Sequence, residues 1–107
     1  MADFVNKEVI QEATRLRREL HRHPELSGKE ENTASRIRDF VKRQSPTEII
    51  ENIGGHGLAA VYDSGREGPS VLFRADLDAL PIEEVNTFDH RSLNEGVSHK
   101  CGHDGHM

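Results

Sequence analysis

The 107-residue sequence predicts an α/β fold in which two amphipathic helices come first, short strands follow, and a loop-rich tail ends the chain. Three observations support this prediction. Apolar residues in the first 45 positions recur at spacings of three and four, which is typical of helices with one packed face. Two short apolar runs follow, at residues 58–62 and 71–75, and Gly and Pro separate them. From residue 78 onward, regular patterning is hard to find.

The first helix is expected over residues 3–22 and ends before Pro24, because the residue before a proline is driven out of the helical region. Its apolar stripe consists of Val5, Val9, Ala13, Leu16 and Leu20. The second helix is expected to start at Ser27, where Ser27 and Glu30 match a capping box. Its stripe continues with Ala34, Ile37, Phe40 and Val41, and Ser45-Pro46 closes it.

The strand region is expected to begin with a short strand at 48–51 and a glycine-rich turn at 52–57. Residues 58–62 form the next predicted strand, and 63–69 form a hairpin-like connection. Residues 71–75 are predicted to be a strand of the buried type. Two or three strands with two helices would make a small and marginally stable sandwich of layers.

Composition and charge narrow the functional class. The hydrophobic share is 34%, so a generous core is ruled out. A net charge of −5 argues against non-specific nucleic-acid binding, which needs clustered Lys and Arg. The longest apolar run is far too short to span a membrane. Cys101 is the only cysteine, so no internal disulfide forms, and we expect a reduced, cytoplasmic setting.

The final nine residues hold the strongest chemical cluster, with three of the seven histidines and the only cysteine. A thiolate and imidazoles are zinc-type ligands. Cys101 and His103 are two residues apart, and both can point at one site if the chain bends at Gly102. The alternative is a polar tail that happens to contain histidines.

Two further clusters carry weaker signals. Asp76 and Asp78 follow a predicted strand and share one face in extended geometry, so they can coordinate a metal or orient a metal-bound histidine. Alternatively, Asp76 pairs with Arg74 and Asp78 caps a turn. His21 and His23 lie near a helix C-terminus, where a structural or surface role is the favoured interpretation.

Three motifs occur in fixed order between residues 20 and 106: LHRHPELS at 20–27, RADLDALPI at 74–82, and RSLNEGVSHKCGHDGH at 91–106. Together they closely resemble the amidohydrolase branch of the aminoacylase-like zinc metallopeptidases. This branch includes hippurate hydrolases, N-acyl-amino-acid amidohydrolases and auxin-conjugate hydrolases. The resemblance implies a three-layer α/β/α catalytic domain with two metal ions and an inserted lid domain.

The resemblance also implies roles for individual residues. Cys101 and His103 match metal ligands, and Asp78 matches the catalytic aspartate that orients the metal site. Asp76 occupies a position where the wider superfamily has a histidine. Asp104 and His106 belong to the motif, but no ligand role is assigned to them.

The implied reaction is metal-assisted hydrolysis of the amide bond of small N-acyl amino acids, with zinc, manganese or cobalt as the ions. Family members run to several hundred residues, so we expect residues 1–107 to be the N-terminal part of the catalytic domain, without the lid. Such a part is expected to hold metal at most in part and to be inactive alone. The alternatives are a small metal-binding module and a non-catalytic interaction protein that self-associates.

Overall fold

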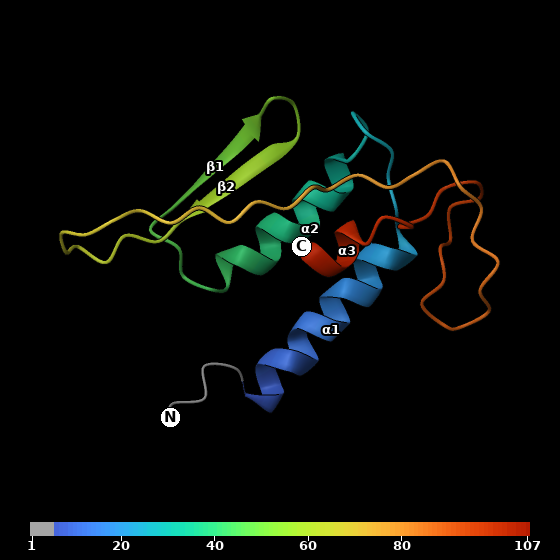
Figure 1. Cartoon of the computed structure of the whole chain (residues 1–107), viewed down its shortest axis with the longest axis horizontal. Coiled ribbons are helices and arrows are strands. Elements are labelled where there is room, and N and C mark those ends of the chain that lie inside the picture. Colours follow the sequence, from blue (N-terminus) through green and yellow to red (C-terminus); the bar gives the residue numbers. More distant parts are fainter. Residues whose placement is uncertain (1–5) are drawn as a thin grey trace.

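The computed structural model describes residues 6–107 and places the helices and strands in the predicted order (Figure 1). The elements of this part are α1 (Lys7–Arg22), α2 (Glu31–Lys42), β1 (Glu48–Ile53), β2 (Gly57–Val61) and α3 (His103–His106). α1 packs against α3, and α2 packs against β2. None of the helices between residues 6 and 107 combines the length and the apolarity needed to cross a bilayer.

α1 confirms the first predicted helix but begins later than expected. Asn6 is the N-cap, with extended backbone, and its side chain accepts a hydrogen bond from the Val9 N–H at 2.9 Å. The predicted start at residue 3 lies outside the described residues. The apolar stripe is covered only near the C-terminal end, because Leu20 is 1% exposed whereas Val9 is 47% exposed.

α2 begins at Glu31, so the prediction of a start at Ser27 is wrong. The capping carboxylate comes from Glu25, in the turn between the two helices. Its Oε1 accepts hydrogen bonds from the backbone N–H and the hydroxyl of Thr33, at 2.5 and 2.6 Å. Thr33 is 1% exposed, so this carboxylate satisfies a buried donor that α2 leaves without an internal partner.

β1 and β2 form an antiparallel hairpin, which confirms the two strands predicted around residues 48–51 and 58–62. Glu48 pairs with Val61, and Ile50 pairs with Ala59. The register shifts between Ile50 and Ile53, which locally disrupts the ladder as a bulge does. The two strands form the only sheet in the part of the chain that the structure describes.

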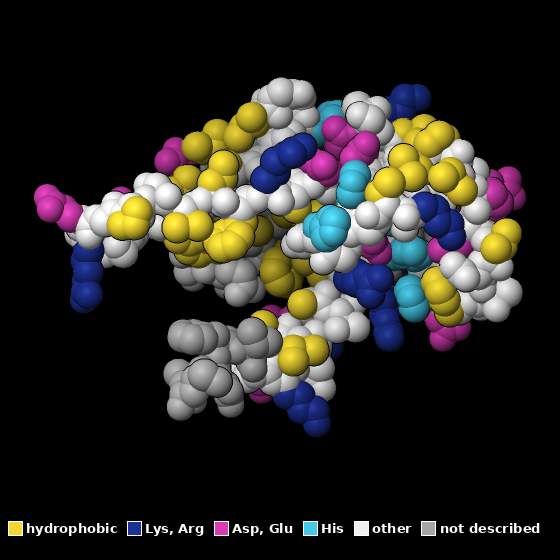
Figure 2. All heavy atoms as spheres, in the orientation of Figure 1, with side chains coloured by type: hydrophobic (Ala, Val, Ile, Leu, Met, Phe, Trp, Pro, Cys, Tyr) yellow, Lys and Arg dark blue, Asp and Glu magenta, His cyan; other side chains and the backbone are white. Residues whose placement is uncertain are grey.

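The prediction of a buried strand at 71–75 is wrong. This segment is extended but pairs with no strand of residues 6–107, and it forms part of a long arm (Figure 1). Val71, Leu72 and Phe73 are 76%, 89% and 91% exposed. Hydrophobic side chains gather along this arm and over the neighbouring hairpin (Figure 2). A strand of the buried type needs partners on both sides, and the described residues supply none there.

The small core lies where the loops of the second half return to the end of α1. Leu26 bridges Ala79 in parallel, and Leu80 bridges Ser98 in the antiparallel sense. Ala79 is 4% exposed, close to the value of Leu20 in α1. The first bridge joins the segments of the first and second motifs, and the second bridge joins those of the second and third.

Candidate metal centre

His103 and Asp78 bring the two predicted metal-site segments together. The Nδ1 atom of His103 lies 2.8 Å from the backbone carbonyl oxygen of Asp78 and 3.0 Å from its Oδ1. The Nε2 atom lies 3.9 Å from Oδ2 of Asp76. The pairing of Leu80 with Ser98 sets this alignment, because it fixes the two segments against each other.

This contact determines which ring nitrogen of His103 is available. When Nδ1 donates its proton to Asp78, the Nε2 lone pair is free for a metal ion. Asp76 pairs with Arg74 at 2.8 Å, which is the alternative that the sequence left open. Both side chains of that pair are exposed, at 45% and 82%, so the pair adds little stability.

Cys101 precedes a sharp bend and carries an exposed thiol. Gly102 has a φ of 81°, in the left-handed region, and serves as the N-cap of α3. Nothing lies within 4 Å of a Cβ built at Gly102, so the backbone angle rather than crowding favours glycine here. The chain therefore bends between Cys101 and His103, which is the condition under which the sequence allowed both residues to point at one site.

A buried polar network contacts the residues on either side of this bend, Lys100 and Asp104. His21, the penultimate residue of α1, is 9% exposed. Its Nδ1 lies 2.8 Å from Oδ2 of Asp104, and its Nε2 lies 2.6 Å from Oε2 of Glu84. Both carboxylate side chains are only 2% exposed. One imidazole thus links α1 to α3 and to the loop that precedes Cys101.

The pKa of Glu84 reflects two opposing effects. Burial by itself raises the pKa of this carboxyl, because it penalises the charged form. Hydrogen bonds from the Ser92 N–H, the His21 ring and the Asn86 amide together outweigh burial and leave the pKa below its ordinary value. The Ser92 N–H donates at 2.6 Å. Glu84 therefore stays ionised in a place where an unpartnered carboxylate would not.

His99 is also buried, at 5% exposed, but unlike Glu84 its side chain has no hydrogen-bond partner at either ring nitrogen among residues 6–107. Burial lowers its pKa, and the nearby Asp104 carboxylate opposes that effect without cancelling it. Neutral imidazole is therefore the favoured form, and its polar atoms are unsatisfied within the described part of the chain.

The donor set fits a metal ion in kind but not in number. Cys101 offers a thiol sulfur, and His103 offers a ring nitrogen whose other nitrogen is already held. A catalytic zinc site uses three protein ligands. Within residues 6–107, no group of three or more His, Cys, Asp or Glu side chains has the arrangement to hold an ion. These residues can supply part of a metal site and do not complete one.

Sequence reasoning found some of this site and missed the rest. The structure joins His103 to Asp78. It also buries His21, for which the sequence favoured a structural or surface role. The parts played by Glu84 and Asp104 were missed. Asp104 lies in the third motif, whereas Glu84 lies just beyond the second and carries no local signal. Their common partner, His21, is 83 residues from Asp104 and 63 residues from Glu84 in the chain.

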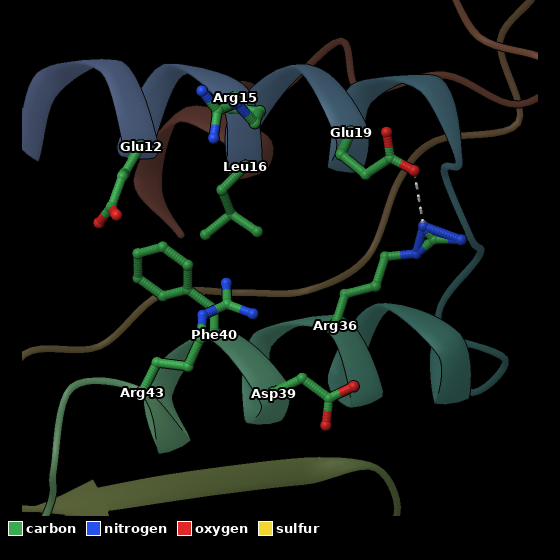
Figure 3. A pocket seen from close by; sticks show the side chains of 8 residues that line it. All are labelled: Glu12, Arg15, Leu16, Glu19, Arg36, Asp39, Phe40 and Arg43. Carbon is green, nitrogen blue, oxygen red and sulfur yellow. Dashed lines mark hydrogen bonds and ion pairs between the residues drawn. The ribbon is translucent and has the colours of Figure 1, made fainter. Parts of the chain in front are cut away.

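A hollow of about 580 Å³ opens between α1 and α2, away from these motifs (Figure 3). Leu16 and Phe40 face each other across it, and Glu19 pairs with Arg36 at 3.3 Å along one side. The guanidinium of Arg43 lies 5.6 Å from the centre of the Phe40 ring. None of the predicted metal-site residues lines this hollow.

The α/β fold and the donor set are typical of metal-dependent hydrolases, and the comparisons with known proteins find relatives of that class. No family model matches the chain. The N-acyl-L-amino acid amidohydrolase of Geobacillus stearothermophilus is 42% identical over 106 residues, covering 99% of this chain and 27% of that protein. The hippurate hydrolase of Campylobacter jejuni is 37% identical, covering 89% of this chain and 24% of that protein.

A solved structure shows the same fold. A dinuclear metal-binding peptidase of the M20 family from Bacillus subtilis matches 92% of this chain and 28% of its own chain, with a TM-score of 0.85 and 36% identity. The resemblance to the amidohydrolase branch of the aminoacylase-like metallopeptidases is thereby confirmed, as is the α/β fold class. The chain spans about a quarter of the length of the relatives that it matches, 24% and 27% for the two enzymes above.

Proposed function

We propose that this chain forms part of the catalytic domain of a metal-dependent amidohydrolase that cleaves the amide bond of N-acyl amino acids. The observation that carries the proposal is the pairing of His103 with Asp78, which leaves Nε2 free. Cys101, whose thiol is exposed, lies two residues earlier in the chain. The names of two relatives support the substrate class, because hippurate is itself an N-acyl amino acid. Residues 1–107 would contribute part of that domain and none of the lid.

Cys101 and His103 are the proposed metal ligands. The description of the M20 relative as dinuclear supports two divalent ions in the complete site. A thiolate together with an imidazole favours zinc, and manganese or cobalt suits the nitrogen and oxygen donors. When bound, such ions lower the pKa of a water molecule and polarise the amide carbonyl. With two ligands of its own, this chain would hold metal only in part.

Asp78 is proposed to orient the ring of His103, and Asp76 lies near the ring nitrogen that is left free. Asp78 holds Nδ1 of His103, which fixes the ring and makes Nε2 the better ligand. Asp78 acts through His103, so we assign it as a positioning residue, whereas the sequence resemblance made it the catalytic aspartate. The carboxylate of Asp76 faces Nε2 from 3.9 Å and lies on the side where a metal ion would sit.

The proposed partner is a small N-acyl amino acid, with neither nucleic acid nor membrane involved. The net charge of −5 supports the absence of a nucleic-acid partner. A reducing compartment such as the cytoplasm suits the site, because a thiolate ligand at Cys101 must stay reduced.

A chimera tests the proposed activity. Residues 1–107 would replace the matching 27% of the Geobacillus stearothermophilus enzyme, and hydrolysis of N-acetylmethionine and of hippurate would be measured with zinc, manganese or cobalt. We expect hydrolysis that His103→Ala and Cys101→Ser remove. His56→Ala, which deletes a histidine in the hairpin turn, is the matched control and should leave the rate unchanged. A folded, metal-loaded chimera without activity would overturn the proposal.

The 107-residue chain alone should give a different result. We expect weak zinc binding and no turnover, because two ligands do not complete a catalytic centre. Robust hydrolysis by the isolated chain would contradict the incomplete site. Tight zinc binding coupled to folding, followed by circular dichroism, would instead identify a self-contained metal-binding module.

A further inference from the structure

The segment that carries Cys101 and His103 has little to hold it in place by itself. α3 has only four residues, far below the length at which a helix is stable alone. Its N-cap is Gly102, which has no side chain to cap the helix. The position of this turn must therefore come from contacts with other parts of the molecule.

Those contacts are made on both sides of the ligand pair. Asp104 follows His103 directly, and its buried carboxylate contacts His21 at 2.8 Å and Arg17 at 3.7 Å, both on α1. Lys100 precedes Cys101, and its Nζ lies 3.7 Å from Oε2 of Glu84. The same oxygen of Glu84 lies 2.6 Å from the other nitrogen of His21.

One imidazole therefore stands at the centre of both contacts. An imidazole can donate from both ring nitrogens at once only in its cationic form, and a cation between two carboxylates satisfies all three groups. The ring is also packed, since Phe88 lies 5.7 Å away in an edge-to-face arrangement. Because the three groups are buried, removing either link deprives a buried carboxylate of its shortest contact with a donor from α1.

We propose that His21 is a positioning residue of the metal site, which clamps the Cys101–His103 turn by holding Asp104 from one nitrogen and Glu84 from the other. This role rests on the proposed function, since it concerns the same two ligands. His21 contacts neither ligand in the described structure and acts only through Asp104 and Glu84.

A matched pair of substitutions separates the two links. His21→Asn places its amide nitrogen near the position of Nδ1 and so keeps a donor for Asp104. His21→Gln places its amide nitrogen near the position of Nε2 and keeps a donor for Glu84. Each variant loses one buried carboxylate contact, so a purely structural histidine predicts similar effects for the two.

The first measurement needs no metal. Backbone amide hydrogen exchange of the full chain reports on the α3 turn through the Met107 N–H, which donates to the His103 carbonyl at 2.9 Å. We expect faster exchange there in His21→Gln than in His21→Asn. Exchange of the Ala79 N–H, which donates to the backbone carbonyl of Glu25 at 2.8 Å, should be the same in both variants. Equal exchange at Met107 in the two variants would overturn the clamp.

The second measurement uses cobalt(II) as the probe and the sulfur-to-cobalt charge-transfer absorption as the signature of Cys101 ligation. His21→Gln should weaken cobalt binding by about 10–100-fold, the usual effect of losing an outer-sphere support, while His21→Asn retains most of the affinity. If the wild-type chain lacks the band, the proposed metal site fails, and amide exchange still decides the clamp. If wild type and both variants bind cobalt equally, the clamp fails and the metal site stands.

Discussion

His99 and His103 are four residues apart, yet their rings meet opposite surroundings. His103 is held at Nδ1 by Asp78, whereas both nitrogens of the buried His99 are unpartnered among residues 6–107. A ligand histidine needs its second nitrogen held by an acceptor, and only His103 meets that condition. The residue type is the same at both positions, so only the contact with Asp78 distinguishes the candidate ligand His103 from His99.

At this scale, Asp78→Asn tests the contact with His103. Loss of the negative charge should lower cobalt(II) affinity about tenfold, because the ring loses its anionic partner and keeps only neutral orienting acceptors, the backbone carbonyl and the new amide oxygen. The cobalt charge-transfer absorption measures the change. Asp89→Asn removes the same charge from an exposed position and should have no effect. Equal losses in the two variants would show that net charge, rather than orientation, matters.

The lowered pKa of Glu84 makes a second residue-scale prediction. The folded-state pKa lies below the ordinary value of 4.5, so the unfolded chain takes up this proton first as the pH falls. The stability contributed by Glu84 is thus fully present above that value and is lost as the pH drops through the folded-state pKa. Urea unfolding should show wild type more stable than Glu84→Gln at neutral pH, with the gap closing as the pH falls below 4.5. A gap that stays constant over this range contradicts the assignment.

At the scale of an element, the start of α2 depends on a residue outside the helix. Glu25 caps Thr33 across the turn, and it also accepts a hydrogen bond from the Asn32 side chain at 3.2 Å. The capping box expected at Ser27 is absent, because α2 begins only at Glu31. The turn between the helices therefore determines where α2 starts.

Two substitutions distinguish these caps. Glu25→Ala should lower the free energy of unfolding by about 1 kcal/mol or more, since the N–H and hydroxyl of buried Thr33 lose their acceptor. Ser27→Ala should change it by much less. Chemical denaturation followed by circular dichroism measures both. A larger loss from Ser27→Ala would restore the capping box that the sequence suggested.

At the scale of the whole molecule, the main feature is a solvent-exposed apolar surface. The arm around Leu72 and Phe73 presents large hydrophobic side chains (Figure 2). Its backbone pairs with no strand among residues 6–107. An extended apolar segment with a free edge is a template for pairing with another chain. Among residues 6–107, the buried apolar side chains are those of Leu20, Pro24, Ala79 and Val97, so this exposed area is large relative to the core.

The isolated chain is therefore expected to self-associate through this arm. Leu72→Lys should shift it toward monomer, because a charge on an unpaired strand opposes edge-to-edge pairing. Light scattering coupled to size-exclusion chromatography measures the mass as a function of concentration. Val85→Lys is the matched control, since Val85 is 85% exposed but lies in a different loop. A wild-type chain that remains monomeric at high concentration would rule out this association.

Local patterns predicted much of this protein. The stripe through Leu16 and Leu20 predicted α1, the apolar run at 58–62 predicted β2, and the order of the motifs predicted the family resemblance. These features depend on residues within a few positions of one another, where helix and strand geometry relates spacing directly to burial. The bend at Gly102 is a local feature as well, since glycine readily adopts the left-handed backbone found there, but the sequence indicated it only as a condition.

Tertiary structure decided the rest. The run at 71–75 has the composition of a buried strand, but burial depends on neighbours that the described residues do not provide. His21 meets Glu84 and Asp104 across 63 and 83 residues, a distance over which no spacing rule operates. Pairing between distant segments depends on how the loops return to α1, which is a property of the packed chain rather than of any stretch of sequence.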